Sequence, residues 1–98
     1  MNPDATIRIR LLTTKEGGRR EAIEGPRYGC PLMVNERGFD CRLVLQDSDL
    51  LELGNSYEVG VKFLNRESAV SELEVGKQVS LWEGKTIAVG EVVALHSA

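Results

Sequence analysis

The stretch Thr6-Ile7-Arg8-Ile9-Arg10-Leu11 alternates between polar and apolar side chains without a break. Because successive side chains of a β-strand point to opposite faces, this period of two predicts a strand with one buried and one exposed face. The same alternation returns in later segments of the chain. We therefore expect six strands, near residues 5–13, 28–34, 39–45, 56–64, 77–83 and 86–95.

The segments between these strands carry turn-forming residues. Residues 35–38, Asn-Glu-Arg-Gly, predict a hairpin connection, and residues 46–55 predict a loop. Residues 65–73 are the one stretch where a short helical turn is expected. Pro31 cannot donate a hydrogen bond to a neighbouring strand, so its strand should be an edge strand or carry a bulge.

The last strand contains Gly90, which suggests a bend or a bulge. Ile87, Val89, Val93 and Leu95 are the apolar residues that complete this strand. Six short strands joined by glycine-containing turns are typical of a sandwich or a small barrel, and a closed barrel has no exposed edge to protect. We predict an all-β, six-stranded closed barrel and a single domain spanning residues 1–98.

Composition narrows the classes of function. A formal net charge of −3 argues against a general affinity for nucleic acid, because phosphate binding relies on a cationic excess. No apolar run approaches the roughly 18 residues that cross a bilayer, and residues 1–4 do not begin a secretory signal. Two cysteines and one histidine are too few for a disulfide scaffold or a common zinc site. We expect a cytoplasmic protein without membrane contact, metal or cofactor.

The two cysteines, Cys30 and Cys41, fall on strands that the predicted hairpin makes neighbours. Pairing Val34 with Phe39 sets Cys30 opposite Leu43, which makes the two thiols diagonal neighbours on one face. Two interpretations stay open. The thiols are either small buried apolar groups or a redox pair.

Motifs for catalysis are missing. Gly84-Lys85-Thr86 resembles the end of a phosphate-binding loop, but Val79 stands where the first glycine should be and a strand follows. We therefore predict a hairpin turn and no nucleotide. His96 lies near the end of the chain, and the carboxylates are scattered, so no nucleophile–histidine–acid arrangement is expected. We predict that the chain is not an enzyme.

Two features suggest contacts with a partner. The first is a loop in which Lys15, Arg19 and Arg20 surround a diglycine, with Arg27 shortly after it. The guanidinium group of arginine binds phosphate or carboxylate well, so this loop is a candidate contact region. The alternative interpretation is an ordinary solvated loop. Trp82 occupies a strand position that alternation turns outward, where an exposed tryptophan is often a contact residue.

Taken together, these landmarks resemble the third, C-terminal β-barrel domain of elongation factor Tu and related translation GTPases, over about residues 6–95. Four motifs carry the resemblance: a Glu-Gly-Gly-Arg loop, a glycine–aromatic–proline stretch, a turn before alternating valines, and a closing hairpin. They read here as Lys15-Glu16-Gly17-Gly18-Arg19, Gly25 to Pro31, Leu53-Gly54-Asn55 before Val59-Gly60-Val61, and Trp82 to Val93. The chain departs from the family pattern in a shorter closing turn, a longer connection over residues 65–76 and the absence of the GTPase domain and second barrel.

The resemblance implies a Greek-key barrel without GTPase activity. In the family, the tRNA-facing residues lie in the Glu-Gly-Gly-Arg loop and the closing hairpin turn, and they match Gly18, Arg19, Arg20, Gly84 and Lys85. Two functions follow as expectations. The first is a non-catalytic module that docks to a partner protein or associates with itself, with Trp82 and the Arg19–Arg20 loop as contacts. The second is a translation-associated tRNA or rRNA binder that uses the cations on backbone phosphates.

Overall fold

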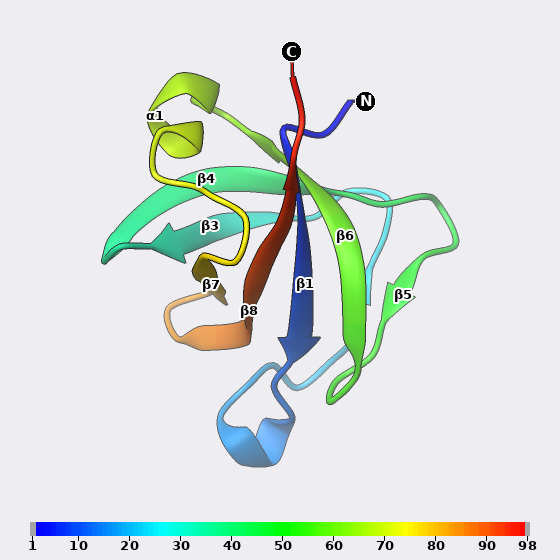
Figure 1. Cartoon of the computed structure of the whole chain (residues 1–98). Coiled ribbons are helices and arrows are strands. Elements are labelled where there is room, and N and C mark those ends of the chain that lie inside the picture. The colour runs from blue at the N-terminus through cyan, green and yellow to red at the C-terminus, as the bar shows by residue number, and fades with distance from the viewer. Residues whose placement is uncertain (1, 98) are drawn as a thin grey trace.

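A computed structural model describes residues 2–97 of the chain (Figure 1). Six antiparallel strands close a barrel in the order β1-β6-β4-β3-β7-β8, and a separate two-stranded sheet pairs β2 with β5. The strands are β1 (Ala5–Leu11), β2 (Ile23–Glu24), β3 (Gly29–Val34), β4 (Arg37–Val44), β5 (Leu50–Leu51), β6 (Ser56–Phe63), β7 (Gln78–Trp82) and β8 (Thr86–Leu95). A 3-10 helix, η1 (Thr14–Glu16), and one short helix, α1 (Arg66–Val70), lie in the connections.

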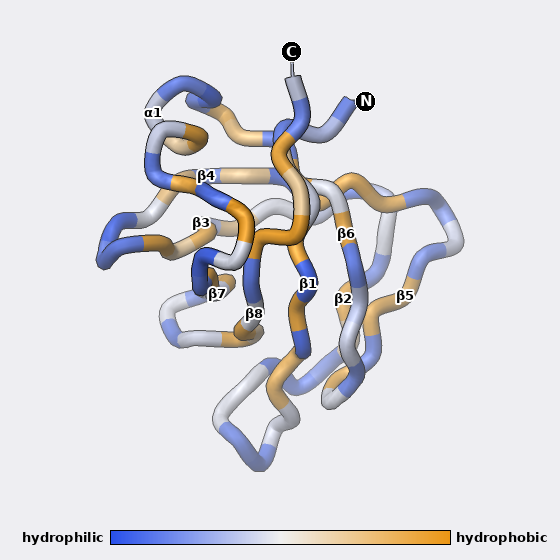
Figure 2. The backbone as a smooth tube through the Cα atoms, viewed as in Figure 1, coloured by the Kyte–Doolittle hydropathy of each residue, from blue (hydrophilic) through white to orange (hydrophobic). Residues whose placement is uncertain are grey.

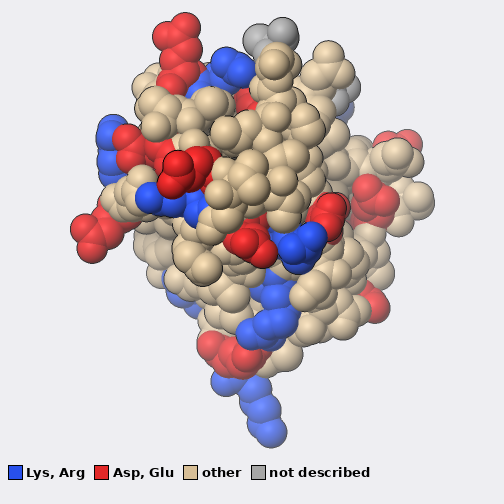
Figure 3. Space-filling model, viewed as in Figure 1, with Lys and Arg blue, Asp and Glu red and all other residues tan. Residues whose placement is uncertain are grey.

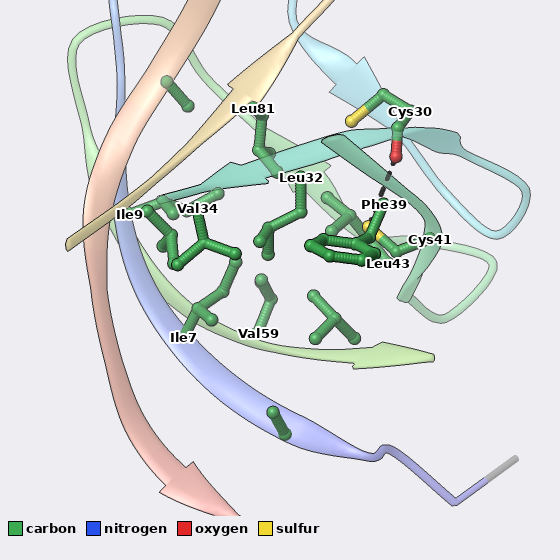
Figure 4. Packing of buried hydrophobic residues seen from close by; sticks show 14 of the residues in the cluster. Ile7, Ile9, Cys30, Leu32, Val34, Phe39, Cys41, Leu43, Val59 and Leu81 are labelled. Carbon is green, nitrogen blue, oxygen red and sulfur yellow. Dashed lines mark hydrogen bonds between the residues drawn. The ribbon is translucent and has the colours of Figure 1, made fainter. Parts of the chain in front are cut away.

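The closed six-stranded barrel predicted from the alternation is confirmed. β3, β4 and β6 are neighbours in chain order. β1, which precedes them in the chain, pairs with β6 at the far side of this group, and this arrangement is a Greek key. Along β1 the hydropathy changes from residue to residue (Figure 2), and its apolar side chains Ile7, Ile9 and Leu11 are buried. Inward side chains from all six barrel strands form one apolar core, part of which Figure 4 shows.

The β3–β4 hairpin is tighter than the sequence predicted. Only Asn35 and Glu36 form the turn, both with left-handed backbone angles (φ 50° and 63°), and Arg37 already pairs with Val34. This geometry matches the two-residue turns whose twist suits antiparallel strands. The predicted pairing of Val34 with Phe39 is therefore wrong by two residues. As a consequence, Cys30 lies directly opposite Cys41 and is not its diagonal neighbour.

The last strand does not keep a single alternation. Ile87 and Ala88 are both buried, whereas Val89 and Leu95 are exposed, so β8 carries an irregularity of the kind that the sequence predicted. The cause is two register shifts, because Trp82 pairs with Thr86 while Leu81 pairs with Ala88, and a second shift falls between the partners of Thr6 and Ile7. Each inserted residue reverses the direction of the following side chains.

β3 is not an edge strand, although it contains Pro31. It lies between β4 and β7, but its pairing with β7 involves only Leu32 and Met33. Pro31 lies just outside this two-residue ladder. Because no partner residue of β7 stands opposite it, the lack of an N–H group at Pro31 costs no hydrogen bond to β7. The ladder between β3 and β7 therefore has fewer paired residues than any other ladder of the barrel.

The connections contain more structure than the sequence predicted. Residues 46–55, expected as a loop, include β5, which pairs Leu51 with Ile23 of β2. The loop after β1 forms η1, where Thr13 and Glu16 make a reciprocal capping box. The helical turn expected over residues 65–73 is present as α1, with Asn65 as its N-cap. Among residues 2–97, no helix has the length and apolar character needed to cross a membrane.

Candidate partner-binding site

Apolar side chains occupy outward positions on the β3 side of the barrel. Trp82 is 42% exposed at the end of β7, and Leu64, directly after β6, is 84% exposed. Pro31 and Met33 point outward from β3, since their neighbours Leu32 and Val34 are buried in the core. We call this surface the Trp82 face and define it by Gly29, Pro31, Met33, Gly38, Leu64 and Trp82.

Two adjoining hollows mark the Trp82 face. The larger, of about 570 Å³, crosses β3, β4 and the end of β6, and its lining includes Gly29, Pro31 and Leu64. The smaller, of about 270 Å³, is lined by Met33, Gly38 and Trp82, together with Pro31 and Asp40. Because Pro31 and Asp40 border both hollows, the two form one continuous surface.

Two glycines shape this surface. Met33 pairs with Gly38 across the β3–β4 ladder, and a Cβ atom at Gly38 would lie 3.0 Å from the sulfur of Met33. Gly29 pairs with Arg42, and a Cβ atom there would lie 3.6 Å from Cγ of Arg42. The absence of side chains at these positions lets the longer side chains of their partners lie flat across the strands.

Charged groups border the apolar surface. Asp40, Arg42 and Lys62 all line the larger hollow. Lys62 donates to the buried carboxylate of Asp4 at 3.4 Å, so part of its charge is already compensated. Arg42 is exposed and forms no ion pair within residues 2–97. The hollow therefore offers an unpaired guanidinium beside apolar side chains.

The structure places Arg19 in a contact within the chain. Its guanidinium forms an ion pair with Glu83 in the β7–β8 turn and lies 5.4 Å from the ring centroid of Tyr28. The Tyr28 hydroxyl also donates a hydrogen bond to Glu83. The basic loop and the closing hairpin, which the sequence analysis treated as two candidate contact regions, are thus joined by Arg19 and Glu83.

The other candidate residues lie around this junction. Lys15, Arg20, Arg27, Gly84 and Lys85 are exposed, whereas Gly18 is buried. A Cβ atom at Gly18 would lie 2.4 Å from the Leu12 carbonyl oxygen, so this glycine is needed by the loop itself. Figure 3 shows basic side chains protruding at the lower end of the molecule, with acidic groups interleaved among the basic ones over the rest of the visible face.

Sequence reasoning found Trp82 but missed the residues around it. Pro31, Met33 and Leu64 were read as parts of strands, and their outward direction depends on the register of the β3–β4 hairpin and on which strands become neighbours. A usable signal was present: in the run Gly29-Cys30-Pro31-Leu32-Met33-Val34, no polar residue occupies either face. An antiparallel strand with one solvated face alternates apolar and polar residues, so this run indicates that the outward face of the strand is apolar as well.

The cysteines lie at the floor of the larger hollow, where Cys30 is 8% and Cys41 is 5% exposed. Both are free thiols, and Sγ of Cys41 donates to the Cys30 carbonyl oxygen at 3.3 Å (Figure 4). The pKa of Cys41 is raised by its hydrogen bond to Cys30 and by burial. The pKa of Cys30 is lowered first by the Cys41 thiol and also by the Trp82 backbone N–H, which outweigh burial.

Within residues 2–97, no three side chains among histidine, cysteine, aspartate and glutamate gather as metal ligands would. His96, the single histidine, shares a hydrogen bond with Oγ1 of Thr6 at 2.8 Å and so helps to hold the end of the chain against β1. Comparison with models of known protein families and with curated proteins finds no match to this chain. The resemblance to the third domain of elongation factor Tu therefore stays a prediction that the motifs alone carry.

Proposed function

We propose that this barrel is a non-catalytic binding module that docks to a partner protein through the Trp82 face. The observation that carries the proposal is the cluster of outward apolar side chains, Pro31, Met33, Leu64 and Trp82, over two adjoining hollows. Aromatic residues and methionine are enriched at protein interfaces, and a contiguous exposed apolar patch marks an interaction site more often than scattered apolar residues do.

The charges around the face define the partner's chemistry. An apolar anchor would fill the hollow between Met33 and Trp82, and a carboxylate would meet Arg42, whose charge is uncompensated within residues 2–97. We therefore propose a partner segment that carries an aromatic or aliphatic anchor next to an acidic residue. The two free, buried thiols suit a reducing compartment, and we place the interaction in the cytoplasm.

Affinity capture with the full chain from the source cells, with and without ribonuclease, tests the proposal when the captured protein is then purified and titrated. Trp82→Ala should weaken the affinity for the purified partner by about thirtyfold or more, since truncation of a central aromatic contact costs about 2 kcal/mol or more. Val89→Ala is the matched control, because Val89 is a similarly exposed apolar residue on β8, and its affinity should stay within about twofold. Equal effects of the two substitutions would refute docking through this face.

Self-association uses the same surface in a different way and is separated by hydrodynamics. If the occupant of the Trp82 face is a second copy, sedimentation of the wild-type chain will show a dimer that Trp82→Ala dissociates. A monomer that nevertheless binds a purified partner supports a heterologous partner. A strictly monomeric chain that captures no protein would refute both forms of the proposal.

A second candidate function, binding to tRNA or rRNA, is favoured by one observation. The Arg19–Glu83 ion pair holds the loop that carries Lys15 and Arg20 against the turn that carries Lys85. We propose that these exposed cations would contact backbone phosphates, with Arg19 as the group that holds the two loops together. Bulk tRNA at low salt is the probe: roughly three phosphate contacts should give a clear loss of affinity as salt rises, and Arg20→Ala with Lys85→Ala should reduce the slope.

A further inference from the structure

The two cysteines lie directly opposite each other on the neighbouring strands β3 and β4. Cys30 pairs with Cys41, and two residues further along the same ladder Leu43 N–H donates to the Tyr28 carbonyl at 3.0 Å. Because hydrogen-bonded and non-hydrogen-bonded pairs alternate, Cys30 and Cys41 form a hydrogen-bonded pair, whose Cα atoms are about 5.5 Å apart. This Cα separation lies within the range that a disulfide spans, about 4.4–6.8 Å, but opposite Cβ atoms are about 4.5–5.5 Å apart, so the two strands must draw together by about 1 Å for the bond to form.

The thiols are buried but have a route to solvent. Both line the hollow of about 570 Å³, which crosses β3, β4 and β6, although neither side chain is more than a tenth exposed. Figure 4 shows the two side chains at one end of the core, with the sulfur of Cys41 beneath the carbonyl of Cys30.

The surroundings of the two thiols are not equivalent. The pKa of Cys30 is lowered first by the Cys41 thiol and also by the backbone N–H of Trp82, while the Tyr28 hydroxyl nearby donates its proton to Glu83. Cys41 is held in the thiol form, because its hydrogen bond to Cys30 and burial raise its pKa. The thiolate is the nucleophilic form of cysteine, so the environment assigns attack to Cys30 and leaves Cys41 as its protonated neighbour.

From this geometry we infer that Cys30 and Cys41 form a dithiol that small hydroperoxides oxidise to a cross-strand disulfide. In the first step the Cys30 thiolate attacks one peroxide oxygen, the O–O bond breaks, and the leaving oxygen takes a proton and departs as water or an alcohol. This leaves a sulfenic acid on Cys30. In the second step the sulfur of Cys41 attacks that of Cys30, the S–O bond breaks, and the hydroxide leaves with the Cys41 proton as water. The dithiol loses two electrons, and the peroxide gains them.

This inference does not depend on partner docking, since it uses the floor of the hollow and not the Trp82 face above it. It predicts that the folded chain treated with hydrogen peroxide loses two free thiols and a mass equal to two hydrogen atoms, and that peptide mapping joins Cys30 to Cys41. Oxidation of Cys30 should be at least about threefold faster in the folded chain than in the same chain unfolded in urea, because the fold supplies the donors that favour the thiolate.

Two variants separate the roles of the thiols. Cys41→Ala should stop the reaction at the sulfenic acid of Cys30, which dimedone traps, and Cys30→Ala should leave Cys41 as an unreacted thiol at the same peroxide concentration. Alanine is chosen because both sites are buried, and circular dichroism checks that each variant keeps the wild-type fold. The inference is overturned if native Cys30 reacts no faster than in the unfolded chain, or if Cys41 of the Cys30→Ala variant is oxidised as fast as the wild-type dithiol.

Discussion

The carboxylate of Asp4, which is 3% exposed, accepts a hydrogen bond from Nε of Arg66 at 3.1 Å. Its second oxygen accepts from the backbone N–H of Phe63 at 2.9 Å. The backbone of Asp4 also bonds to Val61 and His96, so one residue connects β6, α1 and the end of the chain. Figure 1 shows these parts at the same end of the barrel, where both termini lie next to α1.

Asp4→Ala should therefore destabilise the barrel although it removes no apolar contact. The substitution leaves the Phe63 N–H without its acceptor and removes the charge that compensates Arg66. We expect the free energy of unfolding to fall by about 2–3 kcal/mol, measured by urea titration, since the arginine is partly solvated and the amide is buried. Asp47→Ala, at an exposed loop position, is the control and should change it by less than about 0.5 kcal/mol. Equal effects would show that Asp4 is not an anchor.

The hairpin turn predicts a substitution that stabilises. Glu36 holds a left-handed backbone conformation with φ of 63°, which costs a residue with a side chain about 1 kcal/mol. Glu36→Gly converts the turn to Asn-Gly, the preferred sequence for this two-residue turn, and should raise the free energy of unfolding by about 0.5–1 kcal/mol. Glu67→Gly in α1 should have the opposite sign, because glycine is unfavourable in a helix. A loss of stability in Glu36→Gly would contradict the turn geometry.

The same turn shows which parts of the fold could be predicted from the sequence and which could not. Alternation was sufficient to predict β1, β4 and β6, because the period of two depends only on which residues are apolar. The register between β3 and β4 depends on whether two or four residues form the turn, and neither Asn35 nor Glu36 is a glycine. Gly38 favoured the longer turn, and that turn places Cys30 opposite Leu43, two positions away from its actual partner Cys41.

The candidate site was predictable only in part for a related reason. Trp82 was placed outward by alternation within its own strand, but the hollows beside it need β3 to lie between β4 and β7. Arg19 illustrates the limit of motif reasoning. Its partner Glu83 is distant in sequence, so the ion pair that engages it is invisible until the strand order is known.

Acid should weaken the loop that carries the basic residues. The pKa of Glu16 is lowered to about 2 by hydrogen bonds from the Arg10 guanidinium first and then from the Thr13 backbone. A carboxylate with a depressed pKa in the folded state adds stability above its ordinary pKa, near 4.5, and loses it as pH falls toward 2. Wild type should therefore be more stable than Glu16→Gln above this range, and the difference should shrink as pH falls through it.

Urea titrations across this pH range measure the effect, and the carboxylate is exposed, so the difference will be small. Arg10→Met is the matched variant, because it removes the first cause of the lowered pKa and should reproduce the loss seen in Glu16→Gln. A stability difference between wild type and Glu16→Gln that stays constant over the whole range would contradict the capping role of Glu16.

The contact between Arg19 and Glu83 is the last feature to be tested, and it also bears on the two proposed functions. Its side chains are 23% and 30% exposed, so the pair is partly screened by water, and we expect a coupling energy of about 0.5–1 kcal/mol. A double-mutant cycle of Arg19→Ala and Glu83→Ala, followed by urea titration, measures this coupling. A parallel cycle with Arg20→Ala should give none, because Arg20 forms no ion pair within residues 2–97.

The cycle also tells the two functions apart. If the cations bind RNA through loops that this pair holds together, Glu83→Ala should release the loops from each other and lower the affinity for tRNA at low salt, although it removes a negative charge, whereas partner docking through the Trp82 face should change little. A coupling energy of zero would mean that the two loops are not held together by this pair, and the RNA-binding proposal would lose the observation that favours it.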